Sequence, residues 1–298
     1  MIKVKNAVIM AAGTSSRFAP LSFEKPKALI RVKGEVLIER QIIQLREAGI
    51  RDIYIVTGYK SNMFDYLRDK FNVYLRYNHE YAVRNNNSSI KTVEDIIGDT
   101  YICSADNYFT RNPFSAYEDD GYYAAVYSDG PTKEWCLSVD SHGYIDKVHI
   151  GGKACWYMLG HTFWDYSFSR HFIEILNHNY DLLGMADKLW ENIYIGHLDE
   201  LKLKIRKYPE KTIFEFDSLD ELRQFDSSYI NHTGSSIMAS IAERMNIQEG
   251  EIIDICSIKG ENNQSVGFNF KVHERNYRYL YDKSKIISLK NNITEMKG

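Results

Sequence analysis

The stretch that decides the fold is MAAGTSSRFAPLSFEKPKAL, residues 10–29. It follows the apolar run Ala7-Val8-Ile9-Met10, which predicts a buried strand. A bend of small residues after a strand lets the backbone approach a phosphate chain, with its N–H groups pointing at the anion. Arg17 and Lys27 add positive charge where negative charge builds up in phosphoryl or nucleotidyl chemistry. We therefore predict a phosphate-binding loop, in preference to an ordinary strand-to-helix turn that happens to hold two basic residues.

The composition limits the class of protein. The chain has 298 residues, 44% of them hydrophobic, which is enough for one large domain with a small appendage. A net charge of −3 argues against a nucleic-acid partner, which would need a basic surface. There is no run of about 18 apolar residues for a membrane span, and the apolar stretch near the N-terminus is too short for a secretory signal. We expect a cytoplasmic protein.

The four cysteines show no CxxC spacing. They are Cys103, Cys136, Cys155 and Cys256. This pattern favours reduced thiols over a disulfide or zinc framework.

Strand and helix patterns alternate over the first 110 residues. Expected strands are 7–10, 53–57, 73–77 and 101–104, and expected helices are 37–48, 63–70 and 88–97. Such alternation predicts a doubly wound α/β sheet, in which ligands bind at the carboxyl ends of the strands. The small-residue loop, Gly58, Tyr59 and Asp106 all follow strands at that edge.

The pattern changes after residue 120. Residues 121–162 read as short strands separated by turns, followed by helices at 164–177 and 185–193 and strands at 201–208 and 212–217. We interpret this part as a substrate-binding insertion. A polar linker at 227–234 suggests a boundary, giving domains 1–228 and 229–298. The second domain, with a helix near 237–245 and strands at 251–258 and 266–272, is small enough that we expect it to pack on the main domain or on a partner.

The loop resembles the signature of the sugar-phosphate pyrophosphorylases and their cytidylyltransferase relatives, a nucleotidyltransferase family. The matching residues are Ala11, Ala12, Gly13, Arg17, Pro20, Leu21, Pro26 and Lys27. Ser15 stands where the family often has a second glycine. The resemblance implies a Rossmann-like doubly wound mixed sheet of the nucleotide-diphospho-sugar transferase type, with a small C-terminal α+β appendage. It also implies a nucleotide site that includes Thr14, Ser15 and Ser16 and the catalytic cations Arg17 and Lys27.

Two aspartates follow predicted strands, Asp106 and Asp217. Carboxylates with open positions suit Mg²⁺, which keeps substrate phosphates in its shell. Each aspartate alone would more often be a cap or loop residue, but both match metal-binding positions of the family. Glu215 lies two residues before Asp217 and shares its strand face unless the strand is bulged.

Asn85, Asn86 and Ser89 lie at the expected start of a helix. Capping and turn chemistry alone would explain them there. The segment YAVRNNNSSI also resembles the asparagine-containing segment of phosphocholine cytidylyltransferases, which implies contact with the pyrimidine base. The two roles are compatible.

The segment Lys133-Glu134-Trp135 resembles the Glu-Trp of the LicC-like group of bacterial CTP:phosphocholine cytidylyltransferases. In that group a tryptophan and acidic side chains hold the quaternary ammonium, as aromatic faces attract such cations. The resemblance implies an acceptor pocket formed by Glu134, Trp135, Tyr157, Trp190, Glu191 and Glu215. For each aromatic residue taken singly, packing in the core is the alternative.

The resemblance spans residues 1–228 and implies a Mg²⁺-dependent cytidylyltransferase that joins CTP to phosphocholine or a similar small phospho-amine and releases pyrophosphate. The alternatives are a sugar-1-phosphate nucleotidyltransferase, a cytidylyltransferase for an aminoalkyl phosphonate, and a nucleotide-binding module without catalysis. Residues 252–281, including Asn262 and Asn263, resemble the start of the N-lobe of LicA-like choline kinases. We expect no kinase activity from them, and we leave homo-oligomerisation open.

Overall fold

The computed structural model describes residues 1–260 and 265–289, so Asn262 and Asn263 lie outside the described residues. Contacts divide the chain into two compact units. Unit 1 comprises residues 1–13 and 35–215, and unit 2 comprises residues 14–34 and 216–298. The loop expected to bind phosphate therefore begins in unit 1 and continues in unit 2. The domain boundary at residue 228 stays a prediction, since the compact units divide the chain differently.

Unit 1 is built on a seven-stranded mixed sheet with the order β12-β10-β11-β7-β2-β5-β6. Strands β2, β5, β6 and β7 run parallel, β11 runs antiparallel to β7, and β10 runs parallel to β12. This mixed doubly wound sheet confirms the predicted fold class. The strands are β2 (Asn6–Ala11), β5 (Asp52–Thr57), β6 (Tyr74–Tyr77), β7 (Thr100–Ser104), β10 (Tyr122–Val139), β11 (Ile145–Trp164) and β12 (Lys204–Tyr208).

Short strands complete unit 1. Strand β1 (Ile2–Lys3) pairs with β9 (Tyr117–Glu118), and β8 (Asn107–Phe109) pairs with β13 (Ile213–Glu215). Strand β4 spans Glu35–Val36.

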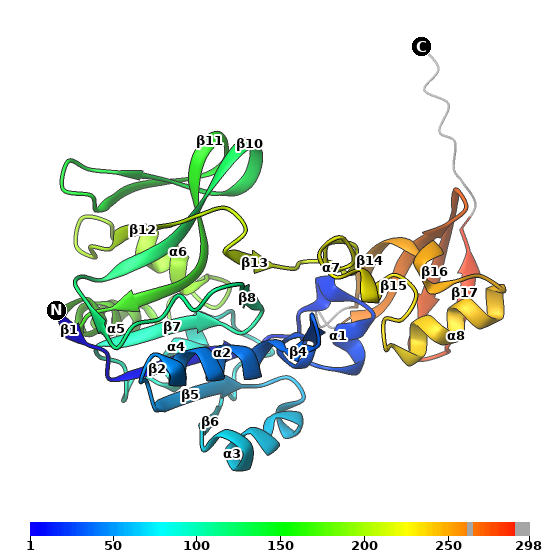
Figure 1. The fold of residues 1–298 in the computed structure, drawn as a ribbon, viewed down its shortest axis with the longest axis horizontal. Helices are drawn as coiled ribbons and strands as arrows, with labels where there is room; N and C mark the ends of the chain where they lie inside the picture. The colour runs from blue at the N-terminus through cyan, green and yellow to red at the C-terminus, as the bar shows by residue number, and fades with distance from the viewer. Residues whose placement is uncertain (261–264, 290–298) are drawn as a thin grey trace. The chain divides into compact units, whose positions relative to one another are not determined.

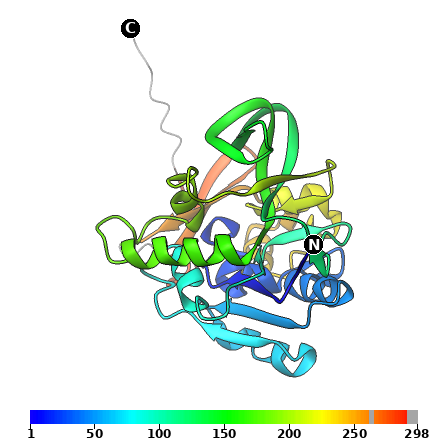
Figure 2. The same ribbon diagram turned by 90° about the vertical axis from the view of Figure 1, so that its left-hand side faces the viewer.

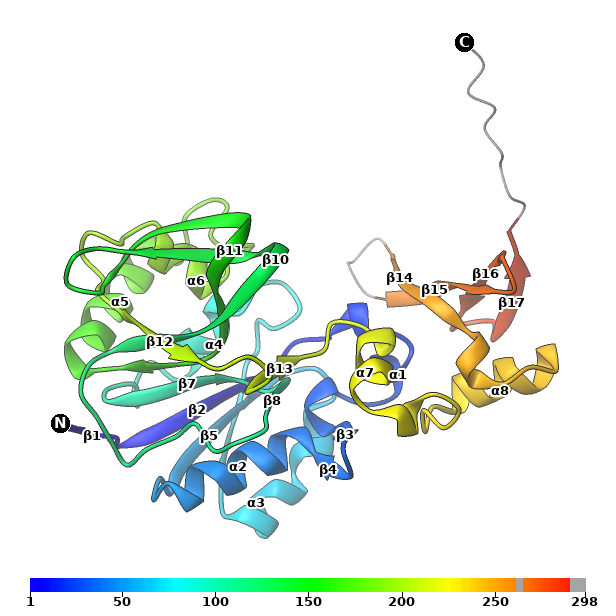
Figure 3. The same ribbon diagram turned by 45° about the horizontal axis from the view of Figure 1, so that its top comes forward.

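Helices cover both faces of the sheet. In Figure 3, α2 (Leu37–Glu47) and α3 (Tyr66–Phe71) lie on one side, with α4 (Asn87–Thr92), α5 (Tyr166–Asn179) and α6 (Trp190–Ile195) on the other. The second layer packs on the sheet through one buried cluster, in which Val8 and Ile102 meet Trp164 and Phe172. Burial of this apolar surface holds the layers together.

The long hairpin of β10 and β11 differs from the short strands expected over residues 121–162. Its strands have 18 and 20 residues, and their outer ends extend from the sheet as an arm, which we define as residues 128–157 (Figure 1 and Figure 2). Within the arm Cys136 pairs with both His149 and Tyr157, so the hairpin curls back on itself. Bulges accommodate the curl, and they break the alternation that would have marked a long strand.

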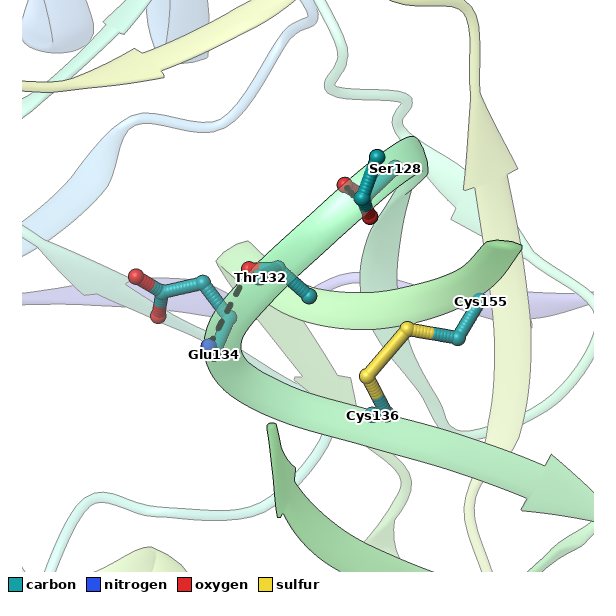
Figure 4. The surroundings of a disulfide bond; sticks show 6 residues. Ser128, Thr132, Glu134, Cys136 and Cys155 are labelled. Atoms are coloured by element: carbon teal, nitrogen blue, oxygen red, sulfur yellow. Dashed lines mark hydrogen bonds between the residues drawn. A yellow bond between two sulfur atoms is a disulfide. The ribbon is translucent and has the colours of Figure 1, made fainter. Parts of the chain in front are cut away.

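The expectation of reduced thiols is wrong for two of the cysteines. Cys136 and Cys155 form a disulfide within the arm, with Cα atoms 5.9 Å apart (Figure 4). They are 19 positions apart in sequence, and the curled hairpin brings them together. Gly152 lies against the bond, where a Cβ would come within 2.7 Å of the Cys136 sulfur. Cys103 and Cys256 are free thiols.

Unit 2 combines the continuation of the loop with the C-terminal part of the chain. The loop forms 3-10 helix η1 (Ser16–Phe18), helix α1 (Leu21–Glu24), 3-10 helix η2 (Lys27–Leu29) and strand β3 (Arg31–Val32). The C-terminal part holds α7 (Leu219–Phe225), η4 (Ser227–Tyr229), α8 (Ser236–Met245) and η5 (Glu249–Glu251).

A four-stranded antiparallel sheet follows α8 and lies beside it in Figure 3. Its strands are β14 (Ile253–Lys259), β15 (Ser265–Val272), β16 (Arg275–Leu280) and β17 (Lys285–Ser288). The helix and the first two strands were predicted. Among the described residues, every helix is too short or too polar to cross a lipid bilayer.

Candidate functional site

The first residues of the loop lie at the carboxyl end of β2. Ala11 and Ala12 are buried, and Gly13 is exposed. The Tyr59 N–H donates to the Ala12 carbonyl over 3.0 Å, which fastens the end of β5 to the loop. Gly58 is buried, and a Cβ there would lie 2.6 Å from Tyr81. Only glycine therefore fits at position 58, whatever contact Gly58 and Tyr59 make with a nucleotide.

The rest of the loop is described within unit 2. Thr14 is exposed, and Ser15 and Ser16 are partly exposed. Ser15 adopts φ +46° and ψ +43°, the left-handed conformation that glycine takes most easily. This conformation explains why the family often has glycine at this position.

The two cations expected to be catalytic have different surroundings. The Arg17 side chain is 75% exposed and pairs with the Asp217 carboxylate over 2.6 Å. Lys27 is buried, with its Nζ 5.6 Å from the centre of the Phe18 ring. The Asp217 backbone N–H also donates to Glu221. The structure thus brings a predicted phosphate ligand and a predicted metal ligand into direct contact, in an exposed pair of the kind that contributes little to stability.

Asp106 and Glu215 are neighbours within unit 1. The Ser104 hydroxyl donates to the Asp106 carboxylate over 2.7 Å. Strand β13 pairs with β8 so that Glu215 faces Asn107, whose amide donates to the Glu215 carboxylate over 3.3 Å. The sequence separates these acids by more than 100 positions, and the β8–β13 pairing joins them.

The donor chemistry of the two predicted metal ligands suits Mg²⁺. This ion commonly binds one or two protein carboxylates and completes its octahedral shell with water and substrate phosphates. In the described residues no group of three or more His, Cys, Asp or Glu side chains is arranged to hold a metal by itself. Asp106 belongs to unit 1 and Asp217 to unit 2, so their joint role stays a prediction.

Acidic side chains gather around two tyrosines in unit 1. Burial raises the pKa of the Tyr157 hydroxyl, and three carboxylates raise it further, those of Glu134, Glu210 and Glu215. Burial also raises the pKa of the Tyr123 hydroxyl, and the charges of Glu191 and Glu215 raise it further. Glu215 influences both hydroxyls, so these side chains share one acidic region. We call it the acidic cluster and define it by Tyr123, Glu134, Tyr157, Glu191 and Glu215.

Glu191 belongs to the acidic cluster and has a raised pKa. Burial raises its pKa to about 7, against the opposing effect of hydrogen bonds from Asn86 and Tyr123. The Asn86 amide donates over 3.1 Å, and the Tyr123 hydroxyl lies 3.5 Å away. A carboxylate in this setting gains from a cation that compensates its charge.

The asparagine segment fastens α4 to the chain before and within α6. The Asn86 carbonyl oxygen accepts the Trp190 N–H over 2.7 Å, and Asn85 donates to the Asp187 carbonyl over 3.1 Å. Asn87, which the sequence analysis did not select, donates to the Met185 carbonyl. Ser89 accepts from Asn78. Asn86 therefore orients α6 and Glu191 in place of the expected side-chain cap on α4, and contact of these residues with a base stays a prediction.

The aromatic candidates differ in burial. Trp190 is 1% exposed, stacks on Tyr123 with ring centres 5.8 Å apart and meets Trp164 edge-on. Because almost none of its surface is exposed, the structure does not support the expected direct contact between Trp190 and an acceptor. Trp135 and Tyr157 are partly exposed on the arm. Figure 4 shows the nearby Glu134 carboxylate pointing away from the disulfide.

Tyr123 is the functional candidate that sequence reasoning missed. It follows Tyr122 in an apolar run, YYAAV, whose pattern does not tell which tyrosine faces the acidic cluster. In the structure Tyr122 bonds to His161, whereas Tyr123 faces Glu191.

Comparisons with known proteins give consistent relatives. Residues 6–120 match the family described as Nucleotidyl transferase. The chain is 32% identical over 220 residues to the choline-phosphate cytidylyltransferase of Streptococcus pneumoniae, covering 74% of this chain and 96% of that protein. It is 33% identical over 229 residues to the 2-aminoethylphosphonate cytidylyltransferase of Lancefieldella rimae, covering 76% and 93%. The solved structure of the pneumococcal CTP:phosphocholine cytidylyltransferase LicC superimposes with a TM-score of 0.73 at 33% identity, covering 76% of this chain and 99% of that one.

Proposed function

Because the chain belongs to the nucleotidyltransferase family, we propose that it transfers CMP from CTP to phosphocholine or a similar small phospho-amine and releases pyrophosphate. The observation that supports this proposal most is the acidic cluster. Its three carboxylates, with Glu210 nearby, surround two tyrosines and favour a cationic ligand over a neutral sugar. Two relatives of near-equal identity act on choline phosphate and on 2-aminoethylphosphonate, and both acceptors carry a positive charge.

In the proposed reaction, a phosphate oxygen of the acceptor attacks the α-phosphorus of CTP in line, and pyrophosphate leaves. The attacking oxygen is anionic at neutral pH, so no general base is needed. Catalysis then consists of alignment and charge neutralisation. Arg17 would hold the leaving phosphates, and Lys27 would contact the α-phosphate or the incoming phosphate.

Asp106 and Asp217 would hold Mg²⁺. When bound, the ion supplies positive charge that lowers the repulsion between the two phosphate groups. Because Arg17 pairs with Asp217, binding of the nucleotide must exchange this ion pair for contacts to phosphate and metal.

On the acceptor side, Glu134, Glu191 and Glu215 would supply the negative charge that balances the ammonium group. Trp135 and Tyr157 would supply aromatic faces on the arm. Asn86 and Trp190 would act indirectly, because they hold α6 and so place Glu191. Tyr123 would share a hydrogen bond with Glu191 and so help to place its carboxylate.

The test is pyrophosphate release from a matrix of nucleotides and acceptors. CTP, UTP and dTTP would each be combined with phosphocholine, phosphoethanolamine, 2-aminoethylphosphonate and glucose 1-phosphate in the presence of Mg²⁺. We expect turnover with CTP and one or more of the cationic acceptors, and its loss on chelation of the metal. Turnover confined to glucose 1-phosphate would show a sugar-1-phosphate enzyme. Binding of CTP without pyrophosphate from any acceptor would show a module that has lost catalysis.

A further inference from the structure

The segment with the two proposed phosphate-binding cations shares unit 2 with the C-terminal part of the chain. Arg17 lies in η1 and Lys27 in η2, and α1 lies between them. Each 3-10 turn is closed by its own backbone hydrogen bond, from the Phe18 N–H to Ser15 and from the Leu29 N–H to Pro26. Because only two residues separate α1 from each turn, a displacement of α1 would carry both cations with it.

Helix α1 has only four residues, Leu21–Glu24. One turn of helix is not stable alone, because nucleation costs more than a single turn regains. Its position must therefore come from tertiary contacts.

Two of those contacts come from the C-terminal part of the chain. The Phe23 ring stacks on the ring of Tyr281, directly after β16, with centres 3.7 Å apart and planes 9° apart. The Glu24 carboxylate accepts hydrogen bonds from the Ser236 hydroxyl and, over 3.2 Å, from the Ile237 N–H at the start of α8. A carboxylate at a helix N-terminus is favoured by the unpaired N–H groups and the helix dipole.

The flanks of the segment have separate attachments. At its start, Arg17 pairs with Asp217. At its end, the Lys33 N–H donates to Asp226 over 2.6 Å, and the Tyr229 hydroxyl donates to the Arg31 carbonyl. Residues before 230 thus hold both ends, with β14 also beside η1, whereas α8 and Tyr281 hold the middle. The alignment with the pneumococcal relative covers 96% of that protein but leaves about a quarter of this chain unaligned.

We propose that α8 and the four-stranded sheet act as a positioning element for the phosphate loop, with Tyr281 and Glu24 as its positioning residues. The proposal rests on the proposed function, since it assigns the loop to the nucleotide phosphates. It gives the C-terminal part a role in nucleotide binding, in addition to its packing.

The first test uses the full-length chain with Tyr281→Ala, Tyr281→Phe and Tyr277→Ala. Tyr277→Ala is the matched control, because it removes a similar aromatic stack, on Phe270 with centres 5.5 Å apart, in the same sheet. CTP affinity is measured by calorimetry without acceptor, alongside KM for each substrate and the melting temperature. We expect Tyr281→Ala to weaken CTP binding about 3- to 10-fold, the range of an aromatic pair contact, with acceptor KM within about twofold. Tyr281→Phe keeps the stack and should restore wild-type affinity.

The second test measures the protection of the loop amides in the absence of substrate. Hydrogen exchange of the amides of residues 14–34 should accelerate in Tyr281→Ala and in Glu24→Ala but stay at the wild-type rate in Tyr277→Ala. The proposal is overturned if Tyr281→Ala and Tyr277→Ala lower the melting temperature alike while exchange in the loop and CTP affinity stay unchanged. A wild-type protein that binds no CTP would instead refute the proposed function, and the exchange experiment would still decide whether the C-terminal part positions the loop.

Discussion

Glu191→Gln should change how the stability of the protein depends on pH. Burial raises the Glu191 pKa to about 7, from an ordinary value of 4.5. Between these two pH values the folded state holds a proton that the unfolded state has released. The contribution of this group to stability is therefore complete below pH 4.5 and is lost as the pH rises through about 7. At about 1.4 kcal/mol for each pH unit, the loss is about 3 kcal/mol.

Glutamine has the shape of glutamate but does not ionise, so the variant avoids this loss. Any hydrogen bond to Asn86 or Tyr123 that glutamine makes less well gives a constant offset, because an amide does not titrate. Relative to wild type, the free energy of unfolding of Glu191→Gln should therefore increase by about 2.5 kcal/mol between about pH 5 and about pH 8.

Urea unfolding of both proteins across that range measures the difference directly. Glu174→Gln, on the exposed side of α5, is the matched control and should keep a constant difference from wild type. If the free energies of unfolding of wild type and Glu191→Gln change with pH in parallel, the raised pKa of Glu191 is refuted. A functional counterpart follows if the charged form binds the acceptor cation. The acceptor KM of wild type should then rise as the pH falls below about 7, and that of Glu191→Gln should not follow this trend.

Four further predictions concern single residues. Lys27→Met, which keeps most of the buried volume, should lower kcat by orders of magnitude with an unchanged circular dichroism spectrum; near-normal turnover would exclude Lys27 from the mechanism. Trp135→Ala should raise the acceptor KM in steady-state assays, and an effect limited to CTP would assign it to the nucleotide site. Ser15→Gly relieves a left-handed serine and should raise the free energy of unfolding by up to about 1 kcal/mol in urea titrations; a loss of stability would contradict that geometry. Cys136→Ser removes a disulfide between residues 19 positions apart and should lower the free energy of unfolding by about 3 kcal/mol. An equal melting temperature of the wild-type protein with and without reductant would contradict this prediction.

The sheet could be predicted because its signals are local. Strand β2 is an uninterrupted apolar run, and α2 shows helical spacing that ends near Gly49. The structure places both elements within a residue or two of their predicted bounds. The doubly wound sheet followed from the alternation of strand and helix, which restricts the topology.

The arm could not be predicted because its curl depends on bulges and on pairs between distant residues. Cys136 meets Cys155 only through this curl, and the several short strands expected over residues 121–162 form two long strands instead. The asparagine segment was ambiguous for a related reason. Asn85 and Asn86 have side chains suited to caps, turns or bases, and the choice depends on residues 185–191, about 100 positions away.

Trp190 shows that residue type alone does not reveal whether a side chain binds a ligand or packs in the core. A tryptophan beside a glutamate suggested a cation site, and Glu191 does belong to the acidic cluster. The adjacent tryptophan is buried in the core against Trp164 and stacks on Tyr123, so it lies behind the acidic cluster. Neighbouring positions of a helix differ by about 100° in direction, so one of the pair can be packed in the core while the other contributes its charge.

The arm carries Glu134, Trp135 and Tyr157 but none of the residues proposed to bind triphosphate. The Cys136–Cys155 disulfide joins its two strands, so the cross-link that stabilises the arm lies entirely within it. Exchange of residues 128–157 between relatives that use different head groups therefore offers a route to new CDP-linked products. Such a graft leaves the sheet edge and the loop that follows β2 in their native sequence.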